Sequence, residues 1–399
     1  MNGGRTLTRA KIIDSKAVIF SHYATTGACE ELRDWLVGLG TREVVYVAFP
    51  FGRNPDTHIR TERYVGGHLQ TTYRSLFGLR LPEPLAYAKD FCHAVLYAIR
   101  FGWGADVLVA GDNLLALAAA CVRHVAGIRR VAYYMIDYTP VRYKQRLLNG
   151  LYYFIDRLAA TRADIVWPLT EQIIRGRFSA GRLDERRVRW QVVPYGSHPL
   201  ADGVTRDFDP GRVVYMGDVI RSKGAGLFVP FARELRRRVP TARFTVIGGG
   251  SDLENVRAEA IAAGLEDVVE LKGFVPEFGD ILALLARGAV AVAPYDPHDA
   301  NNFTFYSDPG KIKAYLGCGL PVVLTDVPPI AQTLVREGAG RIAAYDPADL
   351  AEQVAALMRA PDCTAYRANA RGLGQRFAWP CVFERAFKGL DDERREDQK

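Results

Sequence analysis

The sequence predicts an α/β protein of two successive domains, each built on a parallel β-sheet. Short apolar runs recur along the 399 residues, and each one ends at a polar or glycine-rich turn followed by a helical pattern. Runs of this kind are typical of strands that are buried on both faces of a parallel sheet. The series is interrupted at residues 192–199, where an apolar pair runs into proline and glycine. We therefore predict a linker there between two α/β domains.

The expected strands fall into two groups along the chain. The first domain has them at residues 17–20, 44–48, 107–110 and 131–135, and the second at 213–216, 244–247, 268–271, 289–292 and 321–324. Helical patterns alternate with these runs, as at 227–238 and 252–263. Near the C-terminal end, a last amphipathic helix follows residues 377–380 and leads into a charged tail. The alternation favours doubly wound sheets over separate helical and strand regions.

The composition is that of a globular chain, with 49% hydrophobic and 24% charged residues. It excludes a collagen-like fibre, a disordered chain and a small disulfide scaffold. The six cysteines form neither a CxxC pair nor a metal-ligand spacing, so we expect reduced thiols and a cytoplasmic protein. We find neither the pattern of a secretory signal nor an uncharged apolar run of the roughly 18 residues needed to span a bilayer.

The net charge of +7 is unevenly distributed along the chain. Between residues 127 and 191 there are thirteen basic and six acidic residues, a surplus as large as the net charge of the whole chain. Within this segment, residues 143–162 show a helical pattern with basic and aromatic positions. One interpretation is a helix on the sheet with a solvated basic face. The other is an edge that rests on an anionic membrane or binds a lipid-diphosphate acceptor. No recognition motif accompanies the surplus, so we expect no nucleic-acid partner.

Four motifs follow one another from the linker onward. They are Val-Pro-x-Gly at 193–196, Tyr-Met-Gly-x5-Lys-Gly at 215–224, a glycine-rich turn at 246–250 with Leu-Lys-Gly-Phe-Val-Pro at 271–276, and a Ser-Asp-Pro-Gly-Lys helix start at 307–321. In this order they resemble glycosyltransferases of the GT-B fold, in the group-4-like set (glycosyl transferases group 1). The resemblance implies two Rossmann-like domains with parallel sheets facing a central cleft. We expect an acceptor domain at 1–192, a donor domain at 193–376, and a crossover helix with a charged tail at 377–399 that packs on the first domain.

The resemblance also implies an activity. It predicts a hexosyltransferase-like enzyme, independent of metal and cofactor, that moves a sugar from a UDP- or GDP-type donor to a glycan, a lipid-linked acceptor or a small molecule. Such an enzyme would serve polysaccharide or glycolipid biosynthesis in the cytoplasm, in peripheral contact with the inner face of the cell membrane through residues 127–191. The alternatives are a catalytically silent homologue that acts as a partner subunit, and a sugar-nucleotide epimerase of the same fold.

A nucleotide diphosphate requires backbone N–H groups and cations, because two adjacent phosphates concentrate negative charge. The turn at 217–224 holds Arg221 and Lys223, although a plain surface turn would also explain it. Lys311 stands at a predicted helix start, where a cation is unfavourable unless an anion lies nearby. The resemblance implies that Lys223 and Lys311 contact the diphosphate. The predicted donor-binding residues are Gly217, Arg221, Lys223, Gly249, Phe274, Val275, Ser307, Asp308, Pro309, Gly310 and Lys311.

Several of these residues have structural alternatives. Ser307 or Asp308 is the predicted N-cap of the helix and Pro309 its first turn, which capping alone would explain. The glycines at 248–250 form a tight turn or leave room for a ligand to approach the backbone. Residues 274–275 occupy the position where the resembling enzymes meet the nucleotide base, with core packing as the alternative.

Two positions depart from the family pattern. Many relatives carry a Glu-x7-Glu pair whose second member holds the donor ribose, but this sequence has Tyr306 and Ala314 at those positions. The usual arginine five residues before the phosphate lysine is Asp218, so Arg221 would have to substitute for it. Both departures bear on the identity of the donor and keep the silent homologue as an alternative.

Asp137 is the predicted catalytic base, together with Lys311 as the group that stabilises the leaving diphosphate. It follows the strand at 131–135 and so lies at the carboxyl edge of the first sheet. It resembles the catalytic aspartate of the inverting GT-B glucuronosyltransferase of xanthan assembly, whose lysine at a helix start resembles Lys311. The alternative roles of Asp137 are an N-cap and an ion pair with Arg142.

Three further residues are candidates on the acceptor side. Asp112 follows the strand at 107–110, and His22 and Tyr23 follow the first strand. All three would stand at the carboxyl edge of the same sheet, although a loop histidine or a capping aspartate is more often structural.

Overall fold

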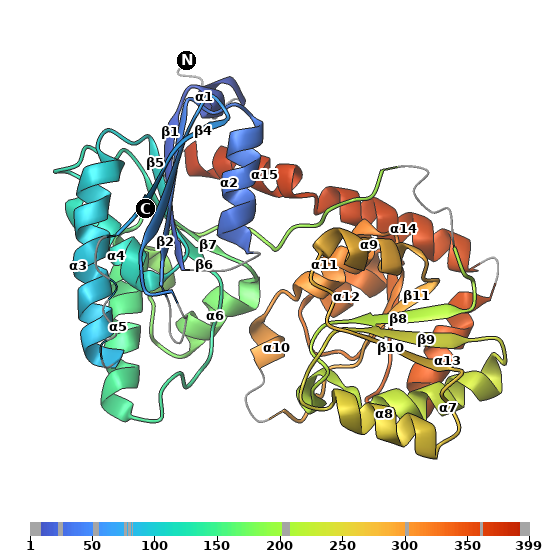
Figure 1. Cartoon of the computed structure of the whole chain (residues 1–399). Helices are drawn as coiled ribbons and strands as arrows, with labels where there is room; N and C mark the ends of the chain where they lie inside the picture. The colour runs from blue at the N-terminus through green and yellow to red at the C-terminus, as the bar shows by residue number, and fades with distance from the viewer. Residues whose placement is uncertain are drawn as a thin grey trace. The chain divides into compact units, whose positions relative to one another are not determined.

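The computed structural model describes residues 9–22, 27–50, 56–75, 78, 81, 83–201, 208–299, 303–359 and 362–391. Contacts divide the chain into two compact units, Met1–Pro194 with Val382–Lys399, and Tyr195–Cys381. Each unit is a β-sheet covered by helices on both faces (Figure 1). The prediction of two α/β domains in series is therefore confirmed.

The first unit contains a seven-stranded sheet in the order β4-β3-β2-β1-β5-β6-β7. Strands β2, β1, β5, β6 and β7 pair in parallel, whereas β3 and β4 form an antiparallel hairpin at one edge. The parallel strands are almost entirely buried, as their apolar sequences predict. The bounds are β1 Lys16–His22, β2 Glu43–Phe49, β3 Arg60–Val65, β4 His68–Arg74, β5 Val107–Ala110, β6 Val131–Met135 and β7 Ile165–Pro168.

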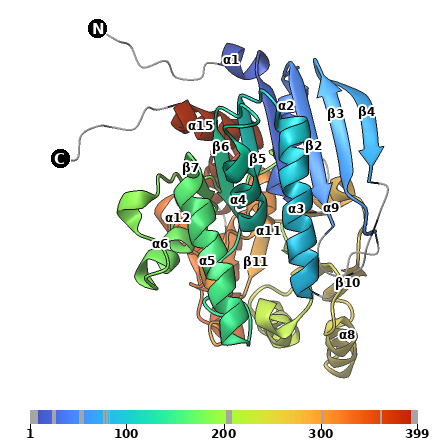
Figure 2. The same cartoon turned by 90° about the vertical axis from the view of Figure 1, so that its left-hand side faces the viewer.

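Helices cover both faces of this sheet (Figures 1 and 2). One face carries α3 (Glu83–Gly102), α4 (Asn113–Val122) and α5 (Arg146–Arg162). The other carries α2 (Ala28–Gly38) and the end of α15 (Trp379–Asp391). Trp35 of α2 packs on Phe383 and Phe387 of α15, with ring centroids 5.5 and 5.6 Å apart. The short elements are α1 Arg9–Ile13, α6 Glu171–Ser179 and η1 Glu185–Arg187.

The second unit contains a six-stranded parallel sheet in the order β10-β9-β8-β11-β12-β13. One apolar cluster packs α7, α8 and α13 on one face, and a second packs α9, α11, α12 and α14 on the other. The strands are β8 Arg212–Met216, β9 Arg243–Ile247, β10 Val269–Gly273, β11 Val290–Ala293, β12 Val322–Leu324 and β13 Gly340–Ile342. The helices are η2 Arg221–Lys223, η3 Ala225–Leu227, α7 Phe228–Arg238, α8 Leu253–Ala262, α9 Phe278–Ala286, α10 Phe303–Tyr306, α11 Gly310–Gly317, α12 Ile330–Arg336, α13 Pro347–Met358 and α14 Asp362–Arg376.

The strand order reverses once in the parallel part of each sheet. In the first unit this happens between β1 and β5, and in the second between β8 and β11. The connections leave in opposite directions at such a point, so a crevice opens at the carboxyl ends of the two strands. These two edges are therefore the places to look for a ligand site. Within the described parts of the chain, no helix is both long and apolar enough to cross a membrane.

Candidate functional site

Lys311 lies at the carboxyl edge of the second sheet, where the strand order reverses between β8 and β11. It stands in the first turn of α11, and its Nζ donates a hydrogen bond to Tyr215 Oη of β8 at 3.0 Å. The same Nζ lies 4.2 Å from the ring centroid of Tyr215 and 5.3 Å from that of Tyr295, which follows β11. Two aromatic rings thus enclose the ammonium group on the side of the sheet.

The ammonium of Lys311 has no carboxylate partner among the residues that the structure describes. Desolvation and, to a smaller extent, the nearby charge of Lys223 lower the pKa of Lys311, Asp218 partly opposes them, and the resulting pKa is about 7. A cation in such surroundings costs free energy unless an anion joins it. The arrangement favours binding of an anionic group at this point.

The turn after β8 is shaped around this lysine. Gly217 has φ 125°, and a Cβ there would lie 2.9 Å from Lys311 Nζ. Gly248, after β9, has φ 143°, and its Cβ would lie 2.1 Å from the carbonyl oxygen of Gly217. Gly250 is similar, with φ 153° and Val219 O at 2.3 Å. Gly248 and Gly250 are therefore required for close packing of two loops, which leaves Gly249 as the glycine of this turn that is open to a ligand.

Lys223 already has an ion-pair partner in the structure. Its Nζ forms an ion pair with Asp218 at 2.5 Å, so the residue that replaces the usual arginine holds the second predicted phosphate cation. The side chain of Arg221 is exposed, and its backbone N–H donates to Asp252 at 3.1 Å. Lys311 is thus the better prepared cation of this edge, because Lys223 must give up a partner to bind an anion.

The predicted N-cap at 307–308 is wrong. Helix α11 begins at Gly310 with Pro309 as its N-cap residue, and no side chain caps it. The carboxylate of Asp308 instead binds Lys313 Nζ at 3.0 Å and accepts the N–H of Tyr195 at 2.7 Å. Asp308 and Lys313 are both buried, and a buried ammonium requires a counter-charge more than a helix start requires a cap.

Other predicted donor residues lie on the same edge. Phe274 follows β10 and is 80% exposed, so the alternative of core packing is wrong for it. Val275 is partly buried against the apolar cluster of α11. Ser307 Oγ donates to the carbonyl of Thr304 at 3.2 Å. Ala314 is buried, and its side chain offers no group for a ribose.

Three tyrosines of this edge were missed by sequence reasoning. Tyr215 Oη donates to the carbonyl of Asp218 at 2.7 Å while it accepts from Lys311, and Tyr315 Oη accepts the N–H of Met216 at 2.7 Å. Tyr295 covers the ammonium from the side of β11. In the sequence, Tyr215 belongs to an apolar strand and Tyr315 to an apolar helix face, so only their hydroxyl groups could have indicated a polar role.

The first unit gathers two carboxylates at its own carboxyl edge. Asp112 caps α4 by accepting the N–H of Leu114 at 2.7 Å, and its Oδ1 lies 3.7 Å from Nε2 of His22 at the end of β1. Burial would raise the pKa of Asp112, but His22, the Leu114 N–H and Arg142 together lower it below its usual value. Tyr23 lies outside the described residues.

Asp137 follows β6 in the same unit. Its Oδ2 accepts a hydrogen bond from Arg142 Nη1 at 2.9 Å, so the ion pair, and not the N-cap, is the structural partner. Arg177 donates to the Asp137 carbonyl at 3.1 Å. Arg142 also stacks on the ring of Tyr152 at 4.8 Å and interacts with the charge of Asp112. One arginine thus links both carboxylates of this edge.

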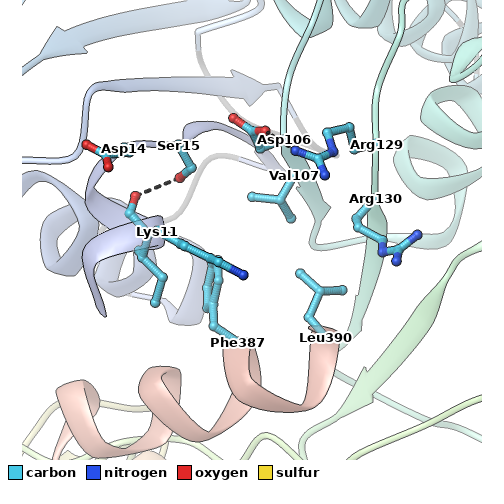
Figure 3. Close-up of a pocket in the computed structure, with 10 residues that line it drawn as sticks. Lys11, Asp14, Ser15, Asp106, Val107, Arg129, Arg130, Phe387 and Leu390 are labelled. Carbon is cyan, nitrogen blue, oxygen red and sulfur yellow. Dashed lines mark hydrogen bonds and ion pairs between the residues drawn. The ribbon is translucent and has the colours of Figure 1, made fainter. Parts of the chain in front are cut away.

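A pocket of about 580 Å³ lies at the amino-terminal ends of the strands of the first sheet, opposite the carboxyl edge (Figure 3). Lys11, Arg129 and Arg130 bring cations to its lining, beneath which lies α15. Asp106, one of the two acids that line it, accepts a hydrogen bond from the N–H of Lys16 at 2.9 Å and one from Arg129 at 3.2 Å, and so holds strand ends together. Because parallel sheets bind ligands at their carboxyl ends, we do not place the reaction here. The described residues include no group of three metal-ligating side chains.

Comparison with solved structures shows the fold. HepE from Anabaena in complex with UDP has a TM-score of 0.67 and 15% identity, over 95% of this chain and all of that one. Sucrose-phosphate synthase from Thermosynechococcus elongatus has a TM-score of 0.66 and 14% identity, over 93% and 97%. The pneumococcal O-GlcNAc transferase GtfA in complex with UDP and GlcNAc has a TM-score of 0.63 and 13% identity, over 95% and 99%. The chain has the GT-B fold, as its motifs predict.

A family model also matches within the second unit. Residues 210–360 match the model of the family described as Glycosyl transferases group 1. This match confirms the resemblance seen in the sequence motifs. No curated protein matches the chain.

Proposed function

We propose that this protein is a glycosyltransferase that moves a sugar from a UDP-type nucleotide donor to an acceptor bound by the first unit. The family of the second unit supports the reaction class, and HepE and GtfA, which have the same fold, bind UDP. The GDP-type donor is the second choice, because no solved structure named above contains it.

The observation that carries this proposal is the partly buried ammonium of Lys311, which has no carboxylate partner among the described residues and lies where the strand order of the second sheet reverses. A diphosphate bound there would place its negative charge against Lys311 and against the N–H groups that begin α11. The same contact would stabilise the diphosphate as it leaves the sugar, because negative charge on its oxygens increases in the transition state. Gly249 and Phe274, at the ends of β9 and β10, would line the nucleotide.

For the acceptor we propose Asp137 as the general base. Its carboxylate is half-exposed at the carboxyl edge of the first sheet and pairs with Arg142 through one oxygen. Asp112 is the weaker base, because its surroundings lower its pKa and its carboxylate already caps α4. His22 would orient the acceptor beside Asp112.

Lys311→Met tests the donor site. The substitution keeps an unbranched side chain under the two tyrosine rings and removes the charge, so we expect UDP binding to weaken at least tenfold. Calorimetry would measure the affinity. Arg236→Ala is the matched control, because Arg236 lies at the far end of α7 and pairs with Asp267 at 3.0 Å. Equal UDP affinity in wild type and Lys311→Met would disprove the assignment.

Asp137→Asn tests the base. The amide keeps a hydrogen-bond acceptor for Arg142 but cannot take a proton, so we expect turnover to fall roughly 100-fold or more while UDP affinity stays within about twofold. Product formation from a UDP-sugar and the acceptor would be followed at saturating donor. A turnover near that of the wild type would move the role to Asp112 and His22.

A catalytically silent homologue is the second candidate, favoured by the engagement of Lys223 with Asp218 and by the buried Ala314. It is distinguished in the same experiments, because such a protein would show no transfer and no slow donor hydrolysis with any UDP-sugar. An epimerase would convert the donor without an acceptor.

A further inference from the structure

The first unit has a small apolar pocket that the proposed reaction does not use. It lies between α3, α4 and α5, has a volume of about 110 Å³, and is lined mainly by aromatic and aliphatic side chains. Those that matter here are Tyr87, Asn113, Leu148, Leu151, Tyr152 and Ile155.

One polar group of this pocket lacks a partner. Asn113 is 4% exposed, and its Nδ2 has no hydrogen-bond acceptor among the described residues. Leaving a buried amide donor unpaired costs free energy, because the group loses its hydrogen bonds to water. An apolar residue would fill this place at no such cost, so the amide at the pocket indicates a ligand with an acceptor atom.

The pocket adjoins the carboxylates of the acceptor edge. Asn113 directly follows Asp112, and both belong to the start of α4. On the other side, Tyr152 stacks on Arg142, which holds Asp137 at 2.9 Å. A molecule whose hydroxyl group lay near either carboxylate would therefore have its neighbouring portion at this pocket.

The pocket opens onto an apolar stripe on the outer face of α5. Leu151 lines the pocket and is itself half-exposed, and Leu147, one turn before it, is 85% exposed. Phe154 continues the stripe, so apolar side chains at i, i+4 and i+7 point away from the core. A stripe of this kind normally packs against another element, and it remains exposed here.

The exposed charged residues of α5 and of the segment just before it are all basic. Lys144, Arg146, Arg157 and Arg162 are exposed, and Arg157 stacks on Phe154 at 5.5 Å. The acid of this helix, Asp156, is fully buried and pairs with Arg177 at 2.7 Å. An apolar stripe with basic borders is complementary to an anionic lipid.

We propose that the pocket binds the first part of the aliphatic chain of an anionic lipid acceptor, with Asn113 Nδ2 donating to the oxygen at which the chain begins. The stripe of Leu147, Leu151 and Phe154 carries the rest of the chain, and the basic border meets the anionic group. The inference deepens the proposed function, on which it rests for calling this lipid the acceptor. The binding itself can be measured without any transfer.

Dodecyl phosphate, kept below its micelle concentration, is the probe for the pocket. We expect calorimetry to show binding to the full chain that is at least tenfold tighter than that of inorganic phosphate. Leu148→Phe, which fills the pocket, should weaken dodecyl phosphate at least tenfold. Leu96→Phe on the exposed side of α3 is the matched control and should leave the affinity within twofold. Equal affinity of both variants, or no binding by the wild type, would overturn the proposal.

Asn113→Leu separates a ligand contact from a structural role. Because Asn113 Nδ2 has no acceptor among the described residues, the variant should unfold at the same temperature as the wild type or higher, while dodecyl phosphate binds at least fivefold more weakly. A loss of thermal stability with unchanged affinity would instead assign Asn113 to the fold. UDP binding to each variant reports on the second unit, so failure of the donor site is seen separately.

Vesicles distinguish the single lipid from the membrane surface. Vesicles of phosphatidylcholine with 30% phosphatidylglycerol should bind the wild type, and the double variant Leu147→Ser, Phe154→Ser should bind them at least fivefold more weakly. Ile261→Ser, at an exposed apolar position of α8, is the control. If vesicle binding depends on the stripe while dodecyl phosphate is indifferent to Leu148→Phe, the surface meets a membrane but the pocket takes no chain, and the proposal fails.

Discussion

At the scale of single residues, Lys311 shows how a cation can be prepared for a ligand. Two tyrosine rings and the Tyr215 hydroxyl hold its ammonium, but the described chain supplies no carboxylate to it. The free protein therefore carries a cost that a bound anion removes. The low pKa of about 7 expresses this cost, since desolvation disfavours the charged form.

This pKa predicts a pH dependence of donor binding. A diphosphate favours the protonated lysine, so binding is strongest below pH 7 and weakens as the pH rises through 7, by up to about tenfold per pH unit. UDP affinity would be measured by calorimetry between pH 7.5 and 9, where the phosphates of UDP are fully ionised. Buffers of different ionisation enthalpy should reveal proton uptake on binding. Lys311→Arg, which stays charged, should remove both effects, and a flat profile in the wild type would contradict the prediction.

The same shift has the opposite consequence for stability. An unfolded lysine has a pKa of about 10.4, so between pH 7 and 10 unfolding takes up a proton and the Lys311 contribution to stability rises with pH. The residue thus destabilises the free fold at neutral pH and below. Function and stability are opposed at this position, as is common at binding sites.

At the scale of elements, the start of α11 is held by a buried ion pair. Asp308 binds Lys313 and also accepts the N–H of Tyr195, the first residue of the second unit. The ring of Phe377 covers the ammonium of Lys313 at 3.6 Å. The helix that presents Lys311 is therefore fixed to the beginning and to the end of its own unit.

Asp308→Ala is expected to destabilise the second unit by about 3–5 kcal/mol, because it leaves a buried ammonium without a counter-charge. Urea unfolding would measure the loss. The double variant Asp308→Ala, Lys313→Met should recover most of it, since no charge is then buried alone. If the single and the double variants were equally unstable, the cost would come from lost packing and not from charge.

The elements that the sequence predicts are those with a buried apolar core. The strands β1, β2, β5, β6, β8, β9, β11 and β12 appear as apolar runs because both faces of each are covered, and β10 was predicted as well although it is only partly buried. The β3–β4 hairpin escaped prediction, since its residues are polar and mostly exposed and its pairing depends on β2. The N-cap at 307–308 was wrongly predicted because capping is local, whereas the pairing of Asp308 with Lys313 depends on a buried tertiary environment.

In the candidate site, too, features of the local sequence could be predicted and features that depend on the tertiary structure could not. Lys311 could be predicted from a charge at an unfavourable place, and Asp137 and Asp112 from their position after strands. The engagement of Lys223 by Asp218 and the enclosure by Tyr215 could not, because they depend on the fold of a loop. The sequence predicts which strand ends carry the candidate residues, but it does not predict the hydrogen bonds among them.

At the scale of the whole molecule, the first unit is discontinuous in the sequence. Residues 382–391 of α15 belong to it, although α14 immediately before them belongs to the second unit. Phe387 contacts Trp35 and also Trp167, at 5.6 and 5.8 Å. Backbone carbonyls of α15 also accept hydrogen bonds from Arg189 and Gln191.

Phe387→Ala should therefore destabilise the first unit, by about 3–5 kcal/mol for a fully buried ring. Denaturant unfolding followed by tryptophan fluorescence would report it, because Trp35 and Trp167 flank the ring. Leu96→Ala, at an exposed position of α3, is expected to change stability by less than about 0.5 kcal/mol. A loss confined to the second unit would show that the pairing with Trp35 does not matter.

The shared helix α15 also has a consequence during synthesis. Domains generally fold one after another as the chain leaves the ribosome, with the N-terminal one first. Here Trp35 is made early, but Phe383 and Phe387, which cover it, are made only after the whole second unit. Part of the apolar surface of the first unit therefore stays exposed until α15 has been synthesised. The second unit can complete its fold before the first. We expect nascent chains that stop before residue 382 to be the ones that chaperones retain.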